Sequence, residues 1–553
     1  MNDSINYTEL KTHKKSKYLY LLISLVLFHV VFNLIWIILN NQPPTWDAAY
    51  HTTLSFQMYS FAKEAMLGLK IKEFLLISNY YPPFTHIFGT FLITILGYSY
   101  KILQFSGTIF FSIALVFIYL YTKELFKSER IAFFSAFFYS FFILVFQQSK
   151  FHMLDIPLTA LVFMSLFFLL KSNNLTNRKF SLFFFIFAGL AFLTKWYAVI
   201  FIMLPFIYCF SGLFKRNVEY KKILKNILIG LTLFLIITLP WYVVNLKFLI
   251  SSLLITSTPE LSDPQNLFSL NNFLFYLKQT IMFQTSSIGF IFFMVSLYLL
   301  LKNKSNKNLQ MVIFTLIFTY IIFTIIGNKN IRFLIPLMPF VAMIMGYGAH
   351  WIFKKGKFFT TFLLSITITY LCLSYFVLSF GIPIYPSYKY AVNLPVIKWT
   401  DIYYLHTYPV KAIYEPKQKL PYLDIVKEIE DIKIKNLRVL MLADSEYINN
   451  GIITPQLYAN SINNIKNFDF VDYDLLIDKN IQNFLDINVD VIVVSKNYLG
   501  LEEGIREYKD LERFHKFTLS GSLKNFEKVK EYSLVGDEYH PDDIIILLQK
   551  VVN

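Results

Sequence analysis

Long apolar runs alternate with short polar segments over residues 18–381. About 20 apolar residues are needed to cross a bilayer as a helix, because the hydrocarbon core is about 30 Å thick. About eleven runs approach that length: 18–39, 103–122, 131–148, 155–170, 180–194, 196–213, 225–246, 281–301, 310–327, 333–353 and 358–381. The pattern therefore predicts a polytopic α-helical membrane protein with about eleven transmembrane helices.

Basic residues gather in alternate loops between these runs. The loops in question are 123–130, 171–179, 215–225, 302–307 and 354–357, and the N-terminal segment 1–17 is basic as well. Because cytoplasmic loops carry an excess of Lys and Arg, we predict that the N-terminus and these loops are cytoplasmic. The chain is then a multi-pass protein of the cell membrane.

One further apolar run, 84–98, is shorter and is broken by Gly89 and Gly97. If it crossed the bilayer, the N-terminus would lie opposite every later basic loop. We therefore predict an interfacial helix within a first outer loop that spans 40–102. The segments that face the same outer side are then 149–154, the turn at 195, 247–280 and 328–332.

The composition changes after residue 381. Charge becomes dense, and short β-branched runs at 437–442, 489–495 and 544–548 alternate with helix-like stretches such as 423–434. This pattern is typical of a small α/β domain. The predicted organisation is thus a cytoplasmic segment 1–17, a transmembrane domain 18–381 and an extracytoplasmic α/β domain 382–553.

Charge and cysteine content exclude two classes of function. The formal net charge is +15, but the cations lie in short loops between apolar runs, which indicates orientation in a membrane and not nucleic-acid binding. Cys209 and Cys372 both lie inside apolar runs. Neither a disulfide framework nor a thiolate metal site is expected.

Four charged residues lie on the predicted outer side, close to the ends of spans: Asp47, Asp155, Lys195 and Arg332. Charges in an apolar chain are costly and by default mark a functional site. Simpler explanations exist, because either acid could stabilise a helix N-terminus and Lys195 could reach the lipid headgroups from its tight turn. Arg332 is the more unusual cation, since basic residues should be scarce on this side.

Other polar groups are predicted near these charges. Asp47, Tyr50 and His51 fall at i, i+3 and i+4, so an acid, a phenol and an imidazole share one helix face. With Tyr81 and His152 they could contact a substrate. His51, His86 and His152 could join the two acids in binding a divalent cation, but their spacing matches no tight metal motif, and we interpret them as ordinary interfacial histidines.

Aromatic residues gather at the outer ends of the spans. We interpret most of them as an interfacial belt and not as part of a site. They are Trp46, Tyr80, Tyr81, Trp196, Tyr197, Trp241 and Tyr242.

Two carboxylates and two cations on one membrane face suit a reaction between a lipid-linked phosphate and an acceptor. A carboxylate can remove a proton from the attacking acceptor, and Arg and Lys can hold the departing phosphate as its charge grows. The residues therefore favour group transfer. A transporter or flippase of a lipid-linked saccharide is the alternative, but polar or broken helices at the midplane and duplicated halves are not visible.

Five sequence segments also carry a family resemblance. They are Trp46-Asp47-Ala48-Ala49-Tyr50; Tyr81-Pro82-Pro83-Phe84; Asp155-Ile156-Pro157-Leu158; Leu190-Ala191-Phe192-Leu193-Thr194-Lys195, followed by Pro240-Trp241-Tyr242; and Arg332-Phe333-Leu334-Ile335-Pro336-Leu337. In this order they resemble the lipid-phosphate-sugar-dependent membrane glycosyltransferases of GT-C fold. That group includes the dolichyl-phosphate-mannose-protein mannosyltransferases (protein O-mannosyltransferases) and the lipid A aminoarabinose transferase.

The resemblance implies a role for each of the four charges. Asp47 would be the catalytic base, Asp155 a second acidic residue of the site, and Lys195 and Arg332 the ligands of the donor phosphate. Two positions depart from the family pattern, because Ala48 replaces a second acid and Tyr81 replaces the lysine of the aminoarabinose branch.

The implied activity is inverting transfer of a sugar from a polyprenyl-phosphate donor to an acceptor at the outer face of the cell membrane. The acceptor would be a protein, a glycan or a lipid. No cofactor is required, although a divalent cation could take part.

Overall fold

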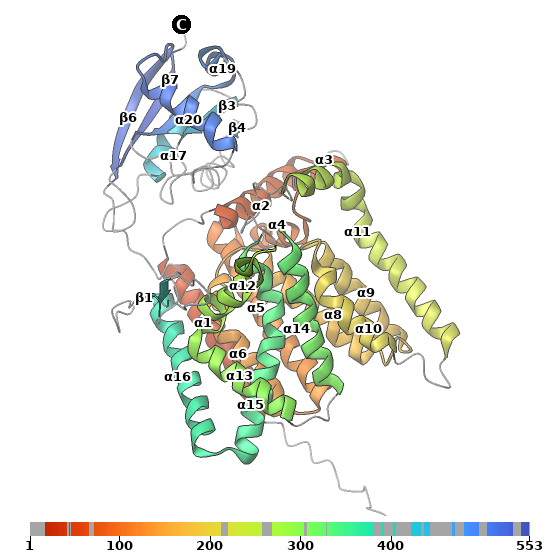
Figure 1. Cartoon of the computed structure of the whole chain (residues 1–553). Helices are drawn as coiled ribbons and strands as arrows, with labels where there is room; N and C mark the ends of the chain where they lie inside the picture. Colours follow the sequence, from red (N-terminus) through yellow and green to blue (C-terminus); the bar gives the residue numbers. More distant parts are fainter. Residues whose placement is uncertain are drawn as a thin grey trace, which may run out of the picture.

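The structure is a computed structural model of the chain, and Figure 1 shows its architecture. It describes residues 17–40, 44, 46–65, 71–211, 219–256, 268–302, 307–327, 329–380, 389–391, 402–404, 422–432, 436–442, 467–470, 480–496, 506–534 and 543–551. The described part contains a large bundle of helices and a separate mixed sheet.

The helices of the bundle follow one another in this order: α1 (Lys17–Leu39), α2 (Trp46–Ala65), α3 (Ile71–Leu76), α4 (Phe84–Leu96), α5 (Tyr100–Phe126), α6 (Glu129–Phe141), α7 (Ile143–Gln148), α8 (Asp155–Lys171), α9 (Arg178–Phe192), α10 (Ala198–Ser211), α11 (Tyr220–Thr256), α12 (Leu270–Gln279), the π-helix η3 (Thr280–Gln284), α13 (Ser286–Lys302), α14 (Lys307–Ile325), the 3-10 helix η4 (Ile331–Leu337), α15 (Met338–Lys355) and α16 (Phe358–Phe380).

Within the described residues, each apolar run predicted to span the membrane is mostly helical. Within the described residues, six helices are long and apolar enough to cross a bilayer, and a seventh span is formed if the pair 270–284 and 286–302, bent by 115°, counts as one. The polytopic helical class is therefore confirmed, whereas the count of eleven spans stays a prediction.

The remaining runs are short or broken for identifiable reasons. Helices α8, α9 and α10 have 17, 15 and 14 residues, which at 1.5 Å per residue gives roughly 21–26 Å, less than a hydrocarbon core of about 30 Å. The run 131–148 is divided into α6 and α7 because Phe142 adopts an extended backbone, with φ −65° and ψ 134°.

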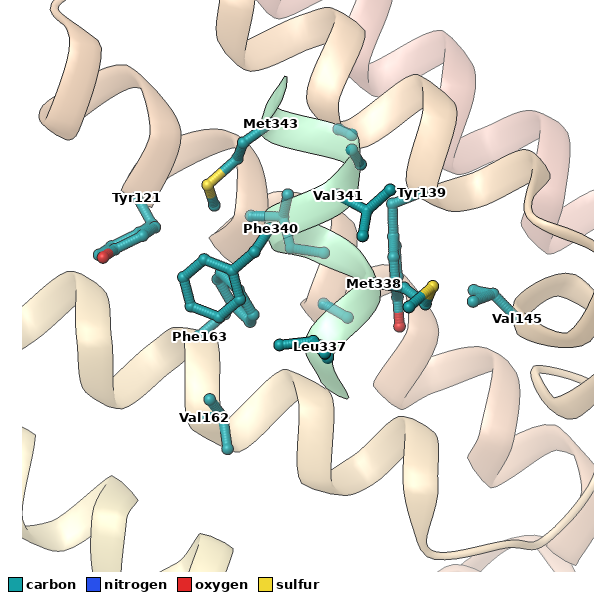
Figure 2. Close-up of a cluster of buried hydrophobic side chains, with 14 of the residues drawn as sticks. Tyr121, Tyr139, Val145, Val162, Phe163, Leu337, Met338, Phe340, Val341 and Met343 are labelled. Carbon is teal, nitrogen blue, oxygen red and sulfur yellow. The ribbon is translucent and has the colours of Figure 1, made fainter. Parts of the chain in front are cut away.

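Helix α15 is buried over most of its length and carries apolar side chains on several faces. Figure 2 shows its side chains and those of η4 surrounded by residues of α5, α6, α7 and α8. The labelled residues are Leu337, Met338, Phe340, Val341 and Met343 inside, and Tyr121, Tyr139, Val145, Val162 and Phe163 around them. All of them are buried, so η4, which precedes α15 directly, is held by a packed core.

Helices α2, α3 and α4 lie together at one end of the bundle (Figure 1). Helix α4 corresponds to the apolar run predicted at 84–98, and it joins α2 and α5 in a small core of Phe56, Ile93 and Leu103. The interfacial position of this helix stays a prediction.

The C-terminal part contains a five-stranded sheet of order β4-β3-β5-β7-β6. Strand β3 is parallel to β4 and β5, and β7 is antiparallel to β5 and β6. The strands are β3 (Asn436–Leu442), β4 (Asn467–Phe470), β5 (Val491–Ser495), β6 (Phe526–Leu534) and β7 (Asp543–Lys550). A two-stranded sheet of β1 (Lys389–Ala391) and β2 (Ile402–Tyr404) precedes them.

Helices cover both faces of this five-stranded sheet. Helix α17 (Tyr422–Asp431) packs on one face through Ile425 and Ile429, and α19 (Ile481–Asn488) and α20 (Arg506–Leu519) pack on the other through Phe484 and Phe514. The strands predicted at 437–442, 489–495 and 544–548 correspond to β3, β5 and β7. The limits of this domain and its outer location stay predictions.

Candidate active site

Asp47 and Arg332 form an ion pair between the first turn of α2 and the start of η4. Arg332 Nη2 donates a hydrogen bond to Asp47 Oδ2. Asn330 caps η4, and its Oδ1 accepts from the backbone N–H of Arg332 at 3.0 Å and from Arg332 Nε at 3.1 Å. Asn330 therefore orients the guanidinium that bonds to the carboxylate of Asp47.

Asp155 and Lys195 form a second, more deeply buried ion pair. Asp155 opens α8, and Lys195 lies in the turn between α9 and α10. Lys195 Nζ donates to Asp155 Oδ1 at 2.7 Å and to Tyr197 Oη at 2.9 Å, and Tyr197 Oη lies 3.4 Å from the same carboxylate oxygen. The side chain of Lys195 is 9% exposed and that of Asp155 is 0% exposed. The ion pair therefore depends on these hydrogen bonds to compensate for lost hydration.

The two ion pairs are neighbours. The ring of Phe333, the residue after Arg332, lies 5.4 Å from Lys195 Nζ. On the other side, Met153 Sδ, two residues before Asp155, lies 3.9 Å from Arg332 Nη1. The structure therefore brings together all four charges that the sequence singles out.

The electrostatics of the cluster depend on burial and on mutual contacts. Burial lowers the pKa of Lys195, the carboxylate of Asp155 opposes that effect, and the positive charge of Arg332 adds to it. The carboxylate of Asp155 therefore stabilises the charged form of the buried Lys195, and the charges of the four residues balance one another.

One oxygen of the buried acid has no partner. Among the described residues, Asp155 Oδ2 is buried without a hydrogen bond. A buried acceptor without a donor costs about 1–3 kcal/mol. The arrangement therefore favours a ligand that brings a hydroxyl or amine donor to this oxygen.

Tyrosine rings lie beside Asp47. Tyr50 is 43% exposed, and its ring centroid lies 5.9 Å from that of Tyr81. Burial raises the pKa of both phenols, and the negative charge of Asp47 raises it further. Both therefore remain neutral at physiological pH and can offer a hydroxyl and a ring face to a sugar.

His51 and His152, which the sequence predicts as substrate contacts, are 2% and 1% exposed. His51 Nδ1 lies 3.0 Å from His86 Nε2, and His152 Nε2 lies 2.8 Å from Ser55 Oγ. Burial lowers the pKa of His152 to about 3. Both histidines are therefore buried and form hydrogen bonds with protein groups.

Among the residues that the structure describes, no group of three or more His, Cys, Asp and Glu side chains is arranged to hold a metal ion. The histidines that could have joined the two acids are instead hydrogen-bonded to one another and to serine hydroxyls.

Several residues of this region are missed by sequence reasoning. The sequence predicts Tyr197 in the interfacial belt, but it is 5% exposed and forms hydrogen bonds with both Lys195 and Asp155. Asn330 orients Arg332. The signal that could have identified Tyr197 and Asn330 is their position two residues from a candidate charge.

Lys150 is a further buried cation, 2% exposed, in the turn that also holds His152. Its Nζ donates to Ser379 Oγ and lies 5.2–5.5 Å from the rings of Trp36, Phe146 and Tyr375. Burial lowers its pKa to about 7. It lies among other aromatic groups and makes no contact with the four charges.

Comparisons with known proteins agree with this geometry. Residues 81–243 match the family described as dolichyl-phosphate-mannose-protein mannosyltransferase. The matched region includes Tyr81, Asp155 and Lys195, whereas Asp47 and Arg332 lie outside it. A comparison with curated protein sequences finds no match.

Two solved structures share the fold. ArnT from Cupriavidus metallidurans bound to undecaprenyl phosphate aligns with a TM-score of 0.57 at 12% identity, covering 96% of this chain and 98% of that chain. The same protein in the apo state aligns with a TM-score of 0.54 at 13% identity and the same coverage. These findings confirm the resemblance seen in the sequence: part of the chain matches a mannosyltransferase family, and the chain shares the GT-C fold of ArnT.

Proposed function

We propose that this chain transfers a sugar, with inversion, from a polyprenyl-phosphate carrier to an acceptor at the outer face of the membrane. The observation that carries the proposal is the meeting of the Asp47–Arg332 and Asp155–Lys195 ion pairs in one place. The similarity in fold to a protein whose structure holds undecaprenyl phosphate supports a polyprenyl-phosphate carrier.

In the proposed reaction Asp47 is the general base. An oxygen or nitrogen of the acceptor attacks the anomeric carbon while the bond from that carbon to the phosphate oxygen breaks. Asp47 takes the proton of the acceptor, and polyprenyl monophosphate leaves with the bonding electrons. Attack from the face opposite the leaving group inverts the anomeric centre.

Arg332 and Lys195 would bind the donor phosphate. Among the described residues, Arg332 Nη1 is directed to a thioether, Met153 Sδ at 3.9 Å, and a phosphate oxygen is a much stronger acceptor. Lys195 has three N–H donors, two of which are directed to Asp155 and Tyr197. The growing charge of the leaving phosphate would thus meet two fixed cations.

Donor binding would also activate the base. Asp47 accepts from the same guanidinium that the phosphate would bind, so the phosphate competes with Asp47 for Arg332. A carboxylate released from that hydrogen bond is a better proton acceptor. Asp155 stays with Lys195, and its Oδ2 would accept a hydroxyl of the bound sugar.

The predicted topology places this reaction outside the cytoplasm. Because Cys209 and Cys372 both lie in apolar helices, a single cysteine introduced into the α/β domain can be labelled selectively. We expect a membrane-impermeant maleimide to label Lys516→Cys in intact cells and to leave Lys355→Cys unlabelled. Labelling of the second variant alone would reverse the orientation.

The test of function is mass spectrometry of the polyprenyl-phosphate-sugar pool in cells that lack this chain. We expect one lipid-linked sugar to accumulate and to return to its normal level with the wild type but not with Asp47→Asn. The matched control is Glu129→Gln at the start of α6, where the carboxylate pairs with Lys123. An unchanged pool, or rescue by Asp47→Asn, would exclude Asp47 from the chemistry and favour a transport role.

A further inference from the structure

Three buried histidines connect the helix of the proposed base with its neighbours. They are His51 on α2, His86 on α4 and His152 in the turn before α8, and they are 2%, 0% and 1% exposed. His51 Nδ1 lies 3.0 Å from His86 Nε2, and the rings of His86 and His152 lie 6.3 Å apart. The histidines therefore form one polar cluster within an apolar bundle.

The hydrogen bonds of the cluster define a direction. Ser78 Oγ donates its single hydrogen to the Tyr81 carbonyl at 2.5 Å, so it can only accept from His86 Nδ1, 3.5 Å away. A neutral His86 that donates through Nδ1 has a lone pair on Nε2. That lone pair accepts from Nδ1–H of His51, and both rings are assigned to the same tautomer.

A second branch fixes His152. Ser55 Oγ donates to the His51 carbonyl at 3.2 Å and can accept from His152 Nε2–H at 2.8 Å. The remaining nitrogen, His152 Nδ1, then accepts from Ser106 Oγ at 2.7 Å. Helices α2 and α5 are thereby joined to the turn that leads into Asp155.

The cluster lies next to the proposed catalytic groups, on the same helix as Asp47 and in ring contact with Tyr81. His51 lies one helical turn after Asp47, and its ring centroid lies 4.8 Å from that of Tyr81. Ser78 and Tyr81 belong to the segment between α3 and α4, which Trp241 of α11 also holds through a 2.7 Å bond from Nε1 to the Ser78 carbonyl. The cluster therefore contacts Tyr81 directly and is linked to Asp47 through helix α2.

The rings must be neutral for this pattern to exist. A protonated His86 would turn Nε2–H towards the donor of His51, and the bond between them would be lost. Burial lowers the pKa of His51 and His86, and in His51 the neighbouring His86 and His152 add to the effect.

We propose that His51, His86 and His152 are positioning residues, a neutral relay with fixed tautomers that holds Asp47 and Tyr81 in one geometry towards the donor. This inference rests on the proposed function for its kinetic consequence. Under this proposal His51 and His152 act by positioning other residues and do not contact the substrate.

The first test compares two amides at position 51 in the purified full-length protein. The side-chain nitrogen of His51→Asn replaces Nδ1 and can still donate to His86, whereas that of His51→Gln replaces Nε2 and cannot. With the lipid-linked sugar isolated from cells that lack the chain as donor, we expect His51→Gln to lower kcat about 100-fold, the effect of a misplacement of about 1 Å. His51→Asn should stay within about threefold of the wild type, and KM for the donor should change little in either variant.

The matched control is His29→Phe on α1. His29 is 1% exposed and, among the described residues, neither ring nitrogen has a hydrogen-bond partner. It packs against Phe111 and Phe141, so phenylalanine should preserve both packing and kcat. Equal kcat values for the Asn and Gln variants, or a rise of KM alone, would overturn the positioning role.

A second measurement does not depend on transfer. Imidazole ¹⁵N spectra of the labelled protein at pH 7, assigned by single histidine substitutions, should show Nδ1–H tautomers for His51 and His86 and an Nε2–H tautomer for His152. Any imidazolium or reversed tautomer among the three would refute the relay. If the wild type transfers no sugar, the proposed function fails, and these spectra alone decide on the relay.

Discussion

Arg332 donates a hydrogen bond to the carboxylate of Asp47, a residue 285 positions earlier in the chain. The contact joins the first turn of α2 to the 3-10 helix that leads into the central helix α15. Because Asn330 fixes the other edge of the guanidinium, the position of the base is tied to a helix that is buried over most of its length. The Arg332 side chain is therefore held by Asn330 and Asp47, while its Nη1 is directed towards Met153 Sδ.

Arg332→Lys should impair recognition of the donor. A lysine keeps the charge, but its single ammonium group cannot bond Asn330, Asp47 and a phosphate in the planar arrangement of a guanidinium. Loss of one charge-assisted hydrogen bond of about 1.5–3 kcal/mol corresponds to a roughly 10- to 100-fold fall in kcat/KM, measured by steady-state kinetics with purified donor. Unchanged kinetics would mean that the guanidinium takes no part in donor binding.

The Asp155–Lys195 pair should show strong coupling in stability. Lys195→Met leaves a fully buried carboxylate without its cation, and Asp155→Leu leaves a buried ammonium without its anion. We expect each single change to lower the free energy of unfolding by about 3–5 kcal/mol, and the double variant to recover most of this loss.

The measurement is a double-mutant cycle of unfolding free energy in detergent micelles. Tyr197→Phe, which removes one hydroxyl bonded to this pair, serves as the control for a hydrogen bond without a charge and should cost about 1–2 kcal/mol. Simple additivity of the two charge changes would contradict a coupled buried pair.

The charges of the candidate site could be predicted from the sequence because an apolar chain makes them conspicuous. Asp47, Asp155, Lys195 and Arg332 each lie at or near the predicted end of a span, where a charge needs a reason. Three of the five strands of the C-terminal sheet, β3, β5 and β7, could be predicted as well, since β-branched runs such as 491–495 stand out in a charged segment.

Other features could not be predicted, for physical reasons. Tyr197 carries the same signal as a belt tyrosine, and only tertiary packing turns its hydroxyl towards Lys195. The histidine relay depends on contacts between α2, α4, α5 and a turn, which no local pattern encodes. The end of α9 and the start of α10 lie in one continuous apolar stretch around Lys195, so the turn at Lys195 and not hydropathy separates the two helices.

Stability should fall as the pH is lowered below about 6.5. Burial lowers the pKa of His152 to about 3, whereas an unfolded histidine has a pKa of about 6.5. Between these values the unfolded chain binds a proton that the folded chain does not, so the free energy of unfolding decreases as the pH falls. His152 alone should contribute a loss of about 2 kcal/mol between pH 7 and pH 5.

His152→Gln separates this effect from other titrations, because its amide nitrogen can still donate to Ser55 but cannot take up a proton. Unfolding free energies measured at pH 7 and pH 5 should differ by about 2 kcal/mol less in the variant than in the wild type. The same pH dependence in both proteins would show that His152 is not buried as a neutral ring.

Gly89 offers a test of the relay through packing alone. A Cβ at this position would lie 2.8 Å from Ser55 Oγ and 2.9 Å from His152 Cε1, closer than carbon atoms in proteins approach such groups. Gly89→Ala should therefore push His152 away from Ser55 and lower kcat by at least about tenfold, because a displaced relay no longer aligns Asp47.

Gly189→Ala on α9 is the matched control, since its Cβ would meet neighbours only at 3.5–3.6 Å and an alanine favours the helix by up to about 1 kcal/mol. Kinetic assays, with unfolding midpoints measured in parallel, should show a loss of kcat in Gly89→Ala and none in Gly189→Ala. Equal kcat values for the two variants would mean that α4 can shift without moving the base.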